Sequence, residues 1–197
     1  MNKLWLLASL ALLSVCIAAF SFYQLSRASS TELYGTVVDS KPVVGEIELT
    51  NGDGERVKLS DYQGDVLLVF FGFTNCPDVC PMTMARLAKM SEDMGEPEDV
   101  QVAMITVDPA QDTPEVLANY VRAFHPDFAA LSGSQADIAN AARTFFVGYR
   151  GIQDNQFVHT DTVAVLDREG RMRLVYGQDK VKHIEEDLET LLAQRNW

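Results

Sequence analysis

The chain of 197 residues has the length of one globular domain, and with 47% apolar residues it can bury a normal hydrophobic core. This composition excludes disordered, collagen-like and multi-span membrane proteins. With 16 lysines and arginines against 28 aspartates and glutamates, the net charge of -12 repels phosphate backbones and argues against nucleic acid as a partner.

Residues 1–28 have the pattern of a membrane anchor or signal segment. Residues 4–22 carry no charge and are flanked by positive charges. About 20 apolar residues span a bilayer, so we expect a single transmembrane anchor in the bacterial inner membrane, with its N-terminus in the cytoplasm and the following domain in the periplasm. A signal peptide cleaved near Ser26–Ala28 and a lipoprotein modified at Cys16 are the alternatives. All three place the domain outside the cytoplasm.

A short polar linker, residues 29–33, leads to the main domain, expected over residues 34–197. Its first predicted elements are short strands at 35–39 and 46–50. The turn sequence Asn-Gly-Asp-Gly then leads into a strand at 56–59, which predicts a small antiparallel β-hairpin at the start of the domain.

The rest of the domain alternates strands and helices. In chain order we expect a buried strand at 66–73, a helix at 82–94, a second buried strand at 101–108, helices at 113–124 and 134–147, a β-hairpin at 162–176 and an amphipathic helix at 180–194. Thr113 and Ser134 are the expected N-caps of their helices. This order predicts an α/β, thioredoxin-like domain with an added N-terminal β-hairpin.

Cys76 and Cys80 lie where the first buried strand passes into its helix, in the sequence Cys-Pro-Asp-Val-Cys-Pro. A residue before proline avoids the α conformation, so neither cysteine is expected in mid-helix, and Pro81 is expected at the first helical position. Cys80 would then face the unpaired N–H groups of the first turn, which predicts a lowered pKa for its thiol. The spacing gives two thiolates room to converge on a soft ion such as Cu(I). An inert structural pair is the alternative.

Imidazole is a suitable third copper ligand, and the chain has three histidines. His159 comes just before a buried strand, in the connection that a thioredoxin-like fold brings beside the cysteine loop. His125 follows a helix, where a capping role is favoured, and His183 lies among charged residues of the last helix. The side chains of Met82 and Met84 are expected to pack rather than to bind metal. His159 is therefore the favoured third ligand.

The sequence resembles the Sco/SenC family, the copper chaperones of cytochrome c oxidase assembly, in the stretches FFGFTNCPDVCPMTM, ITVDPAQDTPEVLANYVRAFHPDF, LSGS and VHTDTVAVLDREGR. The similarity covers essentially all of residues 40–195. It implies a membrane-anchored, thioredoxin-like metallochaperone that binds one copper ion, as Cu(I), Cu(II) or both, through Cys76, Cys80 and His159. It also implies delivery of that copper to the binuclear copper site of cytochrome c oxidase subunit II.

One position departs from the family pattern. Val158 stands where family members often have an acidic residue, directly before the histidine. The resemblance therefore leaves open which carboxylate, if any, forms a hydrogen bond to a metal ligand. Asp161 and Asp78 are the candidates.

The cysteine pair also permits chemistry without a metal. Oxidation to a disulfide abolishes copper binding, so a periplasmic thiol reductant is an expected partner, besides a copper donor. The alternative function is a metal-independent thiol:disulfide oxidoreductase, an enzyme that reduces periplasmic cysteines with Cys76 and Cys80 as its redox pair. A peroxiredoxin-like peroxidase fits less well, because it needs an activated cysteine with an arginine partner, and Thr74 and Asn75 precede Cys76.

Overall fold

A computed structural model describes the backbone of residues 12–17, 19–20, 33–152 and 156–193, and the side chains of these residues except 151–152 and 156–159. The chain divides into two compact units, Met1–Leu33 and Tyr34–Trp197, each of which is considered by itself. In the first unit, residues 12–17 are helical and exposed. Within the described ranges, no helix combines the length and the apolar character needed to cross a membrane.

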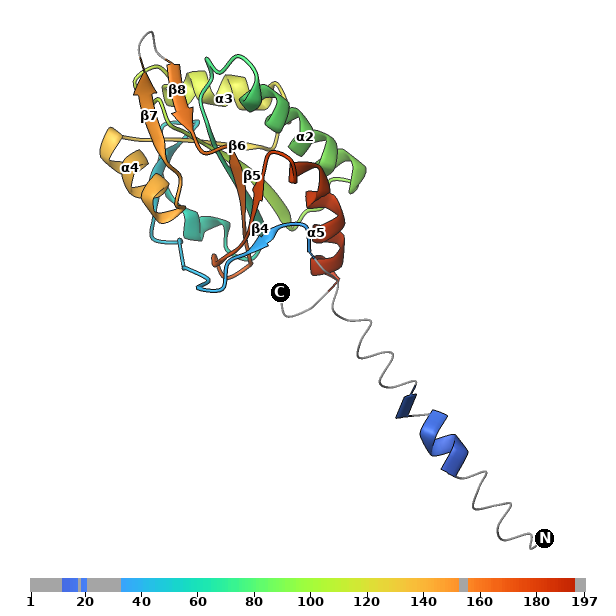
Figure 1. Cartoon of the computed structure of the whole chain (residues 1–197). Helices are drawn as coiled ribbons and strands as arrows, with labels where there is room; N and C mark the ends of the chain where they lie inside the picture. Colours follow the sequence, from blue (N-terminus) through green and yellow to red (C-terminus); the bar gives the residue numbers. More distant parts are fainter. Residues whose placement is uncertain (1–11, 18, 21–32, 153–155, 194–197) are drawn as a thin grey trace, which may run out of the picture. The chain divides into compact units, whose positions relative to one another are not determined.

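The second unit is a mixed α/β structure (Figure 1). Its strands are β1 Thr36–Val37, β2 Glu48–Asn51, β3 Arg56–Lys58, β4 Val66–Gly72, β5 Val100–Thr106, β6 Ala129–Ser132, β7 Tyr149–Ile152, β8 Gln156–His159, β9 Thr162–Leu166 and β10 Met172–Gly177. Its α-helices are α2 Val79–Asp93, α3 Pro114–Arg122, α4 Gln135–Thr144 and α5 Ile184–Leu192, and its short 3-10 helices are η1 Leu59–Tyr62 and η2 Val181–His183.

The described strands form an eight-stranded sheet with the order β1-β10-β9-β4-β5-β6-β2-β3, and β7 and β8 form a separate hairpin. β4, β5 and β6 are parallel neighbours, whereas β9 runs antiparallel to β4. α2 and α5 lie side by side on one face of the sheet, and α4 lies on the other (Figure 1). This arrangement confirms the expected α/β, thioredoxin-like fold class.

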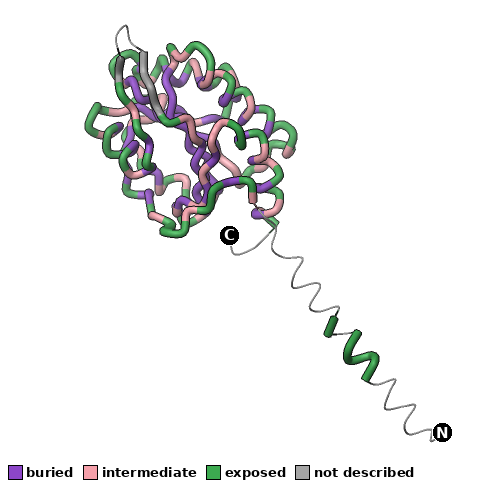
Figure 2. The backbone as a smooth tube through the Cα atoms, in the orientation of Figure 1, coloured by how far each residue is buried: buried purple, intermediate pink, exposed green. Residues whose placement is uncertain are grey.

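The core of the unit is built around β4. Every residue of β4 is buried, because the strand has a hydrogen-bonded neighbour on each side and helices above and below. Figure 2 shows buried residues concentrated along the central strands, with exposed residues on the outer helices and loops. The nearly unbroken apolar run at 66–73 therefore predicted the central strand correctly.

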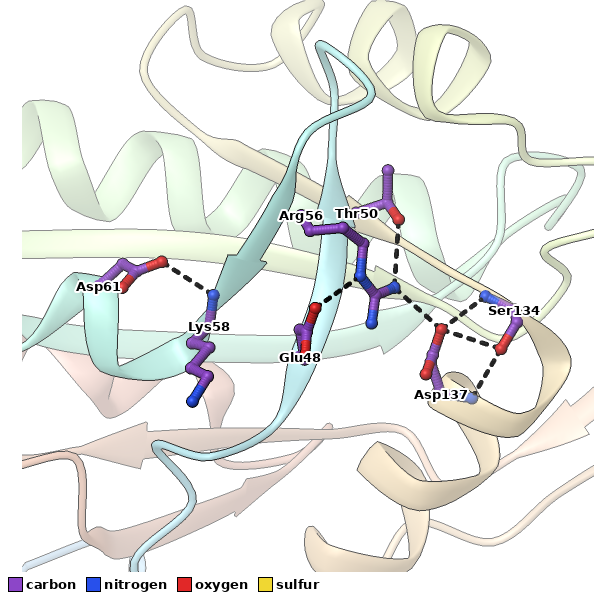
Figure 3. A network of polar contacts seen from close by, with 7 residues as sticks. All are labelled: Glu48, Thr50, Arg56, Lys58, Asp61, Ser134 and Asp137. Atoms are coloured by element: carbon purple, nitrogen blue, oxygen red, sulfur yellow. Dashed lines mark hydrogen bonds and ion pairs between the residues drawn. The ribbon is translucent and has the colours of Figure 1, made fainter.

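The N-terminal hairpin is confirmed as β2 and β3. The side chain of Asn51 accepts hydrogen bonds from the N–H groups of Asp53, at 3.0 Å, and Glu55, at 2.9 Å, which fixes the connecting turn. β2 also pairs with β6, so the hairpin extends the main sheet at that edge. Arg56 of β3 binds the carboxylates of Glu48, at 2.9 Å, and Asp137 of α4, at 3.0 Å, and so ties the hairpin to that helix (Figure 3).

Both predicted N-caps are present. The hydroxyl of Thr113 accepts the N–H of Val116, and the hydroxyl of Ser134 accepts the N–H of Asp137. α4 ends at Thr144, earlier than expected, because Phe146 has a φ of 57° and so leaves the right-handed helical region.

The first residues of the unit are held by the last helix. The carboxylate of Asp187 in α5 accepts hydrogen bonds from the N–H groups of Tyr34, at 3.1 Å, and Gly35, at 2.9 Å. The Tyr176 hydroxyl donates to the same carboxylate at 2.7 Å. A Cβ atom on Gly35 would lie 2.6 Å from the Tyr176 ring, so this close approach requires glycine. Asp187 is only 2% exposed, so these three donors together compensate the burial of its charge.

Candidate metal centre

The two motif cysteines lie together at the junction of β4 and α2. Cys76 is half-buried and Cys80 is fully buried, and neither forms a disulfide. The backbone N–H of Cys80 donates to the sulfur of Cys76 at 3.3 Å. The two side chains are therefore placed for joint use, as ligands of one ion or as partners in a disulfide.

The start of α2 corrects one expectation from the sequence. The helix begins at Val79 after Asp78, so Pro81 is its third residue and not its first. Proline is accepted there because the N–H groups of the first turn have no partner within the helix. One of these groups, the N–H of Cys80, is directed to the sulfur of Cys76. The helix start therefore faces Cys76, whereas the sequence had placed its effect on Cys80.

The expected lowering of the Cys80 pKa is also wrong. Burial raises the pKa of the Cys80 thiol well above its usual value, and hydrogen bonding to Cys76 raises it further. The negative charges of Cys76 and Asp161 act in the same direction, and a backbone hydrogen bond at Phe73 opposes them only in part. Loss of water around the sulfur thus outweighs the favourable helix position.

Gly72, the last residue of β4, makes room for the buried sulfur. A Cβ atom at this position would lie 3.1 Å from the Cys80 sulfur, 2.8 Å from the ring of Phe70 and 2.9 Å from the methyl group of Met104. Only glycine allows these three groups to meet at the end of the strand. Sequence reasoning did not assign Gly72 to the site, although a glycine within an apolar strand indicates such a close approach.

A buried carboxylate fixes the loop that carries Cys76. Asp112 is 1% exposed. Its carboxylate accepts hydrogen bonds from the N–H of Thr74, at 3.1 Å, from the hydroxyl of Thr74, and from the hydroxyl of Thr106, at 2.6 Å. Thr74 begins the cysteine loop, and Thr106 ends β5. Asp112 therefore attaches the cysteine loop to the neighbouring loop between β5 and α3. This role was missed from the sequence, where Asp112 was noted only as part of a family motif.

The backbone that carries the predicted histidine reaches the same edge of the sheet. β9 pairs with β4 so that Val163 lies opposite Phe70, and Asp161 precedes Val163 by two residues, toward the end of β4 that carries Gly72. The effect of the Asp161 charge on Cys80 agrees with that position. His159 ends β8 opposite Tyr149, in a hairpin that the sequence did not predict. Its side chain lies outside the described residues.

The other two histidines have structural contacts. Nδ1 of His125 accepts the N–H of Asp127 at 3.3 Å, and its ring stacks on Phe128. The ring of His183 stacks on Tyr34, with 3.9 Å between ring centroids, and its Nδ1 lies 2.8 Å from a carboxylate oxygen of Glu186.

The remaining candidate residues, two methionines and Asp78, differ in burial and in their place in α2. Met84 is fully buried in the core, Met82 is partly exposed, and Asp78 is the N-cap residue of α2 without a side-chain cap bond. Among the described side chains, which do not include that of His159, no cluster of three or more histidines, cysteines, aspartates or glutamates is arranged to hold a metal. Of the expected metal ligands, the structure thus brings together the two cysteines.

Comparison with known proteins gives consistent matches. The family model for SCO1/SenC matches residues 36–193. An SCO2-like protein of Rickettsia prowazekii is 33% identical over 156 residues, which cover 75% of this chain and 76% of that protein. The human mitochondrial SCO1 homologue is 33% identical over 151 residues, which cover 72% of this chain but only 50% of the human protein.

Solved structures agree with these matches. The apo Sco1 protein of Thermus thermophilus is 39% identical, with a TM-score of 0.71 and coverage of 84% of this chain and 99% of that one. Copper-bound ScoI of Arabidopsis thaliana is 29% identical, with a TM-score of 0.72 and coverage of 78% and 100%.

Proposed function

The chain belongs to the SCO1/SenC family, and from this premise we propose that it is a metallochaperone that carries one copper ion bound to Cys76, Cys80 and His159. The ion is cargo, delivered to the binuclear copper site of cytochrome c oxidase subunit II. Relatives solved with copper bound, from Arabidopsis thaliana and from yeast, support copper as that cargo.

The observation that carries the proposal is the contact between the two cysteines. The N–H of Cys80 reaches the sulfur of Cys76 at 3.3 Å, so one short loop presents both sulfurs. Thiolate sulfur is the preferred ligand of Cu(I), and imidazole completes such a set. The β4–β9 register supports His159 as the third ligand, because it brings the backbone two residues after His159 to the end of β4. Asp161, at that point, takes the place of the acidic residue that Val158 replaces.

Unequal burial of the cysteines suggests the order of copper release. Cys76 is half-buried and Cys80 is inaccessible to solvent. An acceptor protein therefore reaches the Cys76 sulfur first and replaces it as a ligand, while Cys80 still holds the ion. Ligand exchange one sulfur at a time keeps the copper bound throughout the transfer.

The same burial pattern favours a second function, thiol:disulfide exchange. The accessible Cys76 thiolate attacks a substrate disulfide and forms a mixed disulfide, and one substrate thiolate leaves. The Cys80 thiolate then attacks the Cys76 sulfur, and the second substrate thiolate leaves. Two electrons pass to the substrate, and the protein keeps a Cys76–Cys80 disulfide, which a periplasmic thiol reductant must reopen.

We further propose that residues 1–28 anchor the protein in a bacterial inner membrane, with the domain in the periplasm. The uncharged stretch at 4–22, flanked by positive charges, supports this location. A copper donor in the same compartment would load the site.

Competition titration tests the proposed copper site. The reduced full chain is titrated with Cu(I) against a coloured chelator, in parallel with Cys76→Ser, Cys80→Ser, His159→Ala and the control His183→Gln. We expect one tightly bound copper in the parent and the control, loss of tight binding in both cysteine variants, and weaker binding in the His159 variant. Unchanged affinity in His159→Ala would remove His159 from the site. Disulfide reduction by a parent chain that binds no copper would favour the oxidoreductase.

A further inference from the structure

Helix α3 carries a buried hydroxyl group that has no hydrogen-bond partner among the described residues. Among the residues with described side chains, two buried side-chain atoms lack a hydrogen-bond partner, the hydroxyl oxygen of Tyr120 and Oε1 of Gln178. Gln178 is held by its other amide atom, which donates to Thr83 at 2.8 Å. Tyr120 has no second polar group, and its ring packs edge-on against Phe124 at 5.2 Å between centroids. Folded proteins pair nearly all buried polar atoms, so this hydroxyl requires an explanation.

The topology places α3 beside the helix of the cysteines. The chain passes from β4 through α2 to β5 and then through α3 to β6, and these three strands are parallel neighbours. Because such crossovers are right-handed, two successive crossovers in one direction put both helices on the same face of the sheet. α3 therefore lies next to α2, and a tyrosine side chain in α3 points back toward the helix start, where the cysteine loop is fixed by Asp112.

Electrostatics agrees with this position. Burial is the main cause of a raised pKa of the Tyr120 phenol, and the charges of Cys80, Cys76 and Asp112 raise it further, in that order. Charges act on a phenol in this way only from nearby. These charge effects place the Tyr120 phenol within electrostatic reach of the cysteine loop, in agreement with the position that the topology gives it.

Within the described part of the chain, the Tyr120 hydroxyl has no hydrogen-bond partner in the metal-free protein. A phenylalanine would bury the same ring without the cost of an unpaired polar atom. A neutral thiol is a weak acceptor, but a thiolate, the form that binds metal, accepts strong, charge-assisted hydrogen bonds. A donor that is unpaired beside two thiols thus gains a partner when these become copper-bound thiolates.

We propose that Tyr120 is a positioning residue for the copper cargo, whose O–H donates a hydrogen bond to the sulfur of Cys80 when that sulfur is bound to copper. This inference rests on the proposed function. The phenol keeps its proton throughout, and copper entry displaces only the thiol protons. The hydrogen bond fixes the buried sulfur and reduces the electron density that it donates to the metal, as hydrogen bonds to ligands do in other metal sites.

The test compares Tyr120→Phe with Tyr176→Phe in the full chain. Each variant loses one buried hydroxyl, but that of Tyr176 is paired with Asp187 at 2.7 Å and serves folding. Three quantities are measured: the Kd for Cu(I) by chelator competition, the energy of the sulfur-to-copper charge-transfer absorption with Cu(II) as the probe, and the Tm of the metal-free protein.

For Tyr120→Phe we expect a Kd weaker by about 10- to 100-fold, as is typical when a group that supports a metal ligand is removed. The charge-transfer absorption should move to longer wavelength, and the metal-free Tm should stay the same or rise. For Tyr176→Phe we expect the reverse pattern, a lower Tm with unchanged Kd and absorption.

Three results would overturn the inference. If Tyr120→Phe keeps the parent absorption and a Kd within threefold of the parent while the parent binds copper tightly, the inference fails and the proposed function stands. If the parent chain binds no copper, both fail. A fall in Tm alone in Tyr120→Phe would assign the hydroxyl to folding and would also refute the proposal.

Discussion

Replacement of Asp112 by alanine should lower the free energy of unfolding by about 3–5 kcal/mol, because it leaves buried donors without an acceptor. The carboxylate accepts hydrogen bonds from the N–H of Thr74, the hydroxyl of Thr74 and the hydroxyl of Thr106. An unsatisfied buried donor costs about 1–3 kcal/mol. The Thr106 hydroxyl is fully buried and belongs at the upper end of this range. Thr74 is half-buried, so water replaces part of its loss and puts its two donors at the lower end.

Asp112→Asn provides a graded comparison. The amide keeps one oxygen as an acceptor, and the threonine hydroxyls can rotate to meet the NH₂ group, so the main loss is the charge assistance of the bonds. A hydrogen bond to a charged group stabilises the fold by about 1 kcal/mol more than a neutral one. We therefore expect the free energy of unfolding to fall by about 1–3 kcal/mol in Asp112→Asn. Asp53→Ala is the control, because the one side-chain contact of this exposed residue with described residues is a long ion pair of 3.7 Å with Arg122.

Urea unfolding of the metal-free, reduced protein, followed by circular dichroism, gives the free energy of unfolding of the parent and of all three variants. The m-values should equal that of the parent, so that the midpoints report stability. We expect the order Asp53→Ala, Asp112→Asn, Asp112→Ala from least to most destabilised. A loss of less than 1 kcal/mol in Asp112→Ala, at an unchanged m-value, would refute the view that this carboxylate fixes the cysteine loop.

Two further predictions concern the buried sulfur and acid stability. Gly72→Ala should destabilise the domain by about 1–3 kcal/mol in the same urea assay, since the new methyl group overlaps Phe70 and crowds the Cys80 sulfur; parent-like stability would contradict the close contact. For Asp167, burial raises the pKa, but hydrogen bonds from the Arg171 N–H and the Arg173 guanidinium outweigh it, and the net pKa is lowered. Because this pKa is lower in the folded state, the Asp167 carboxylate stabilises the fold at pH values above its unfolded-state pKa of about 3.9. This stabilisation is lost as the pH falls below that value and through the folded-state pKa. Asp167→Asn should therefore be less stable than the parent at pH 7, with a smaller further loss between pH 5 and pH 2; equal pH dependence would contradict this.

Local patterns in the sequence were sufficient for most of the fold. A strand buried on both faces needs an apolar side chain at every position, and residues 66–72 have this pattern except at the terminal glycine. Likewise, Thr113 and Ser134 pair with N–H groups only three residues ahead, so their roles as N-caps can be recognised locally. By contrast, β7 and β8 are short strands without regular alternation, and the sequence did not predict them.

The properties of the candidate site depend on contacts between distant segments. The pKa of Cys80 follows mainly from burial, which the sequence around the cysteine does not encode, so the favourable helix position gave the wrong direction. Asp112 reaches Thr74 across 38 positions of the chain, and the Tyr120 hydroxyl becomes noteworthy only once its lack of a partner is known. Motifs thus identified which residues carry the chemistry, whereas their protonation and support required the fold.

The attachment of Tyr34 and Gly35 to Asp187 affects how the domain forms during synthesis. These hydrogen bonds join residues 152 and 153 positions apart, so the beginning of the domain finds its partner only when its last helix has been made. β4 likewise cannot complete its pairing until β9, Thr162–Leu166, has been synthesised. Such distant pairings slow folding. The domain therefore reaches its native state only after α5 has been synthesised, and until then its apolar strands need protection from aggregation.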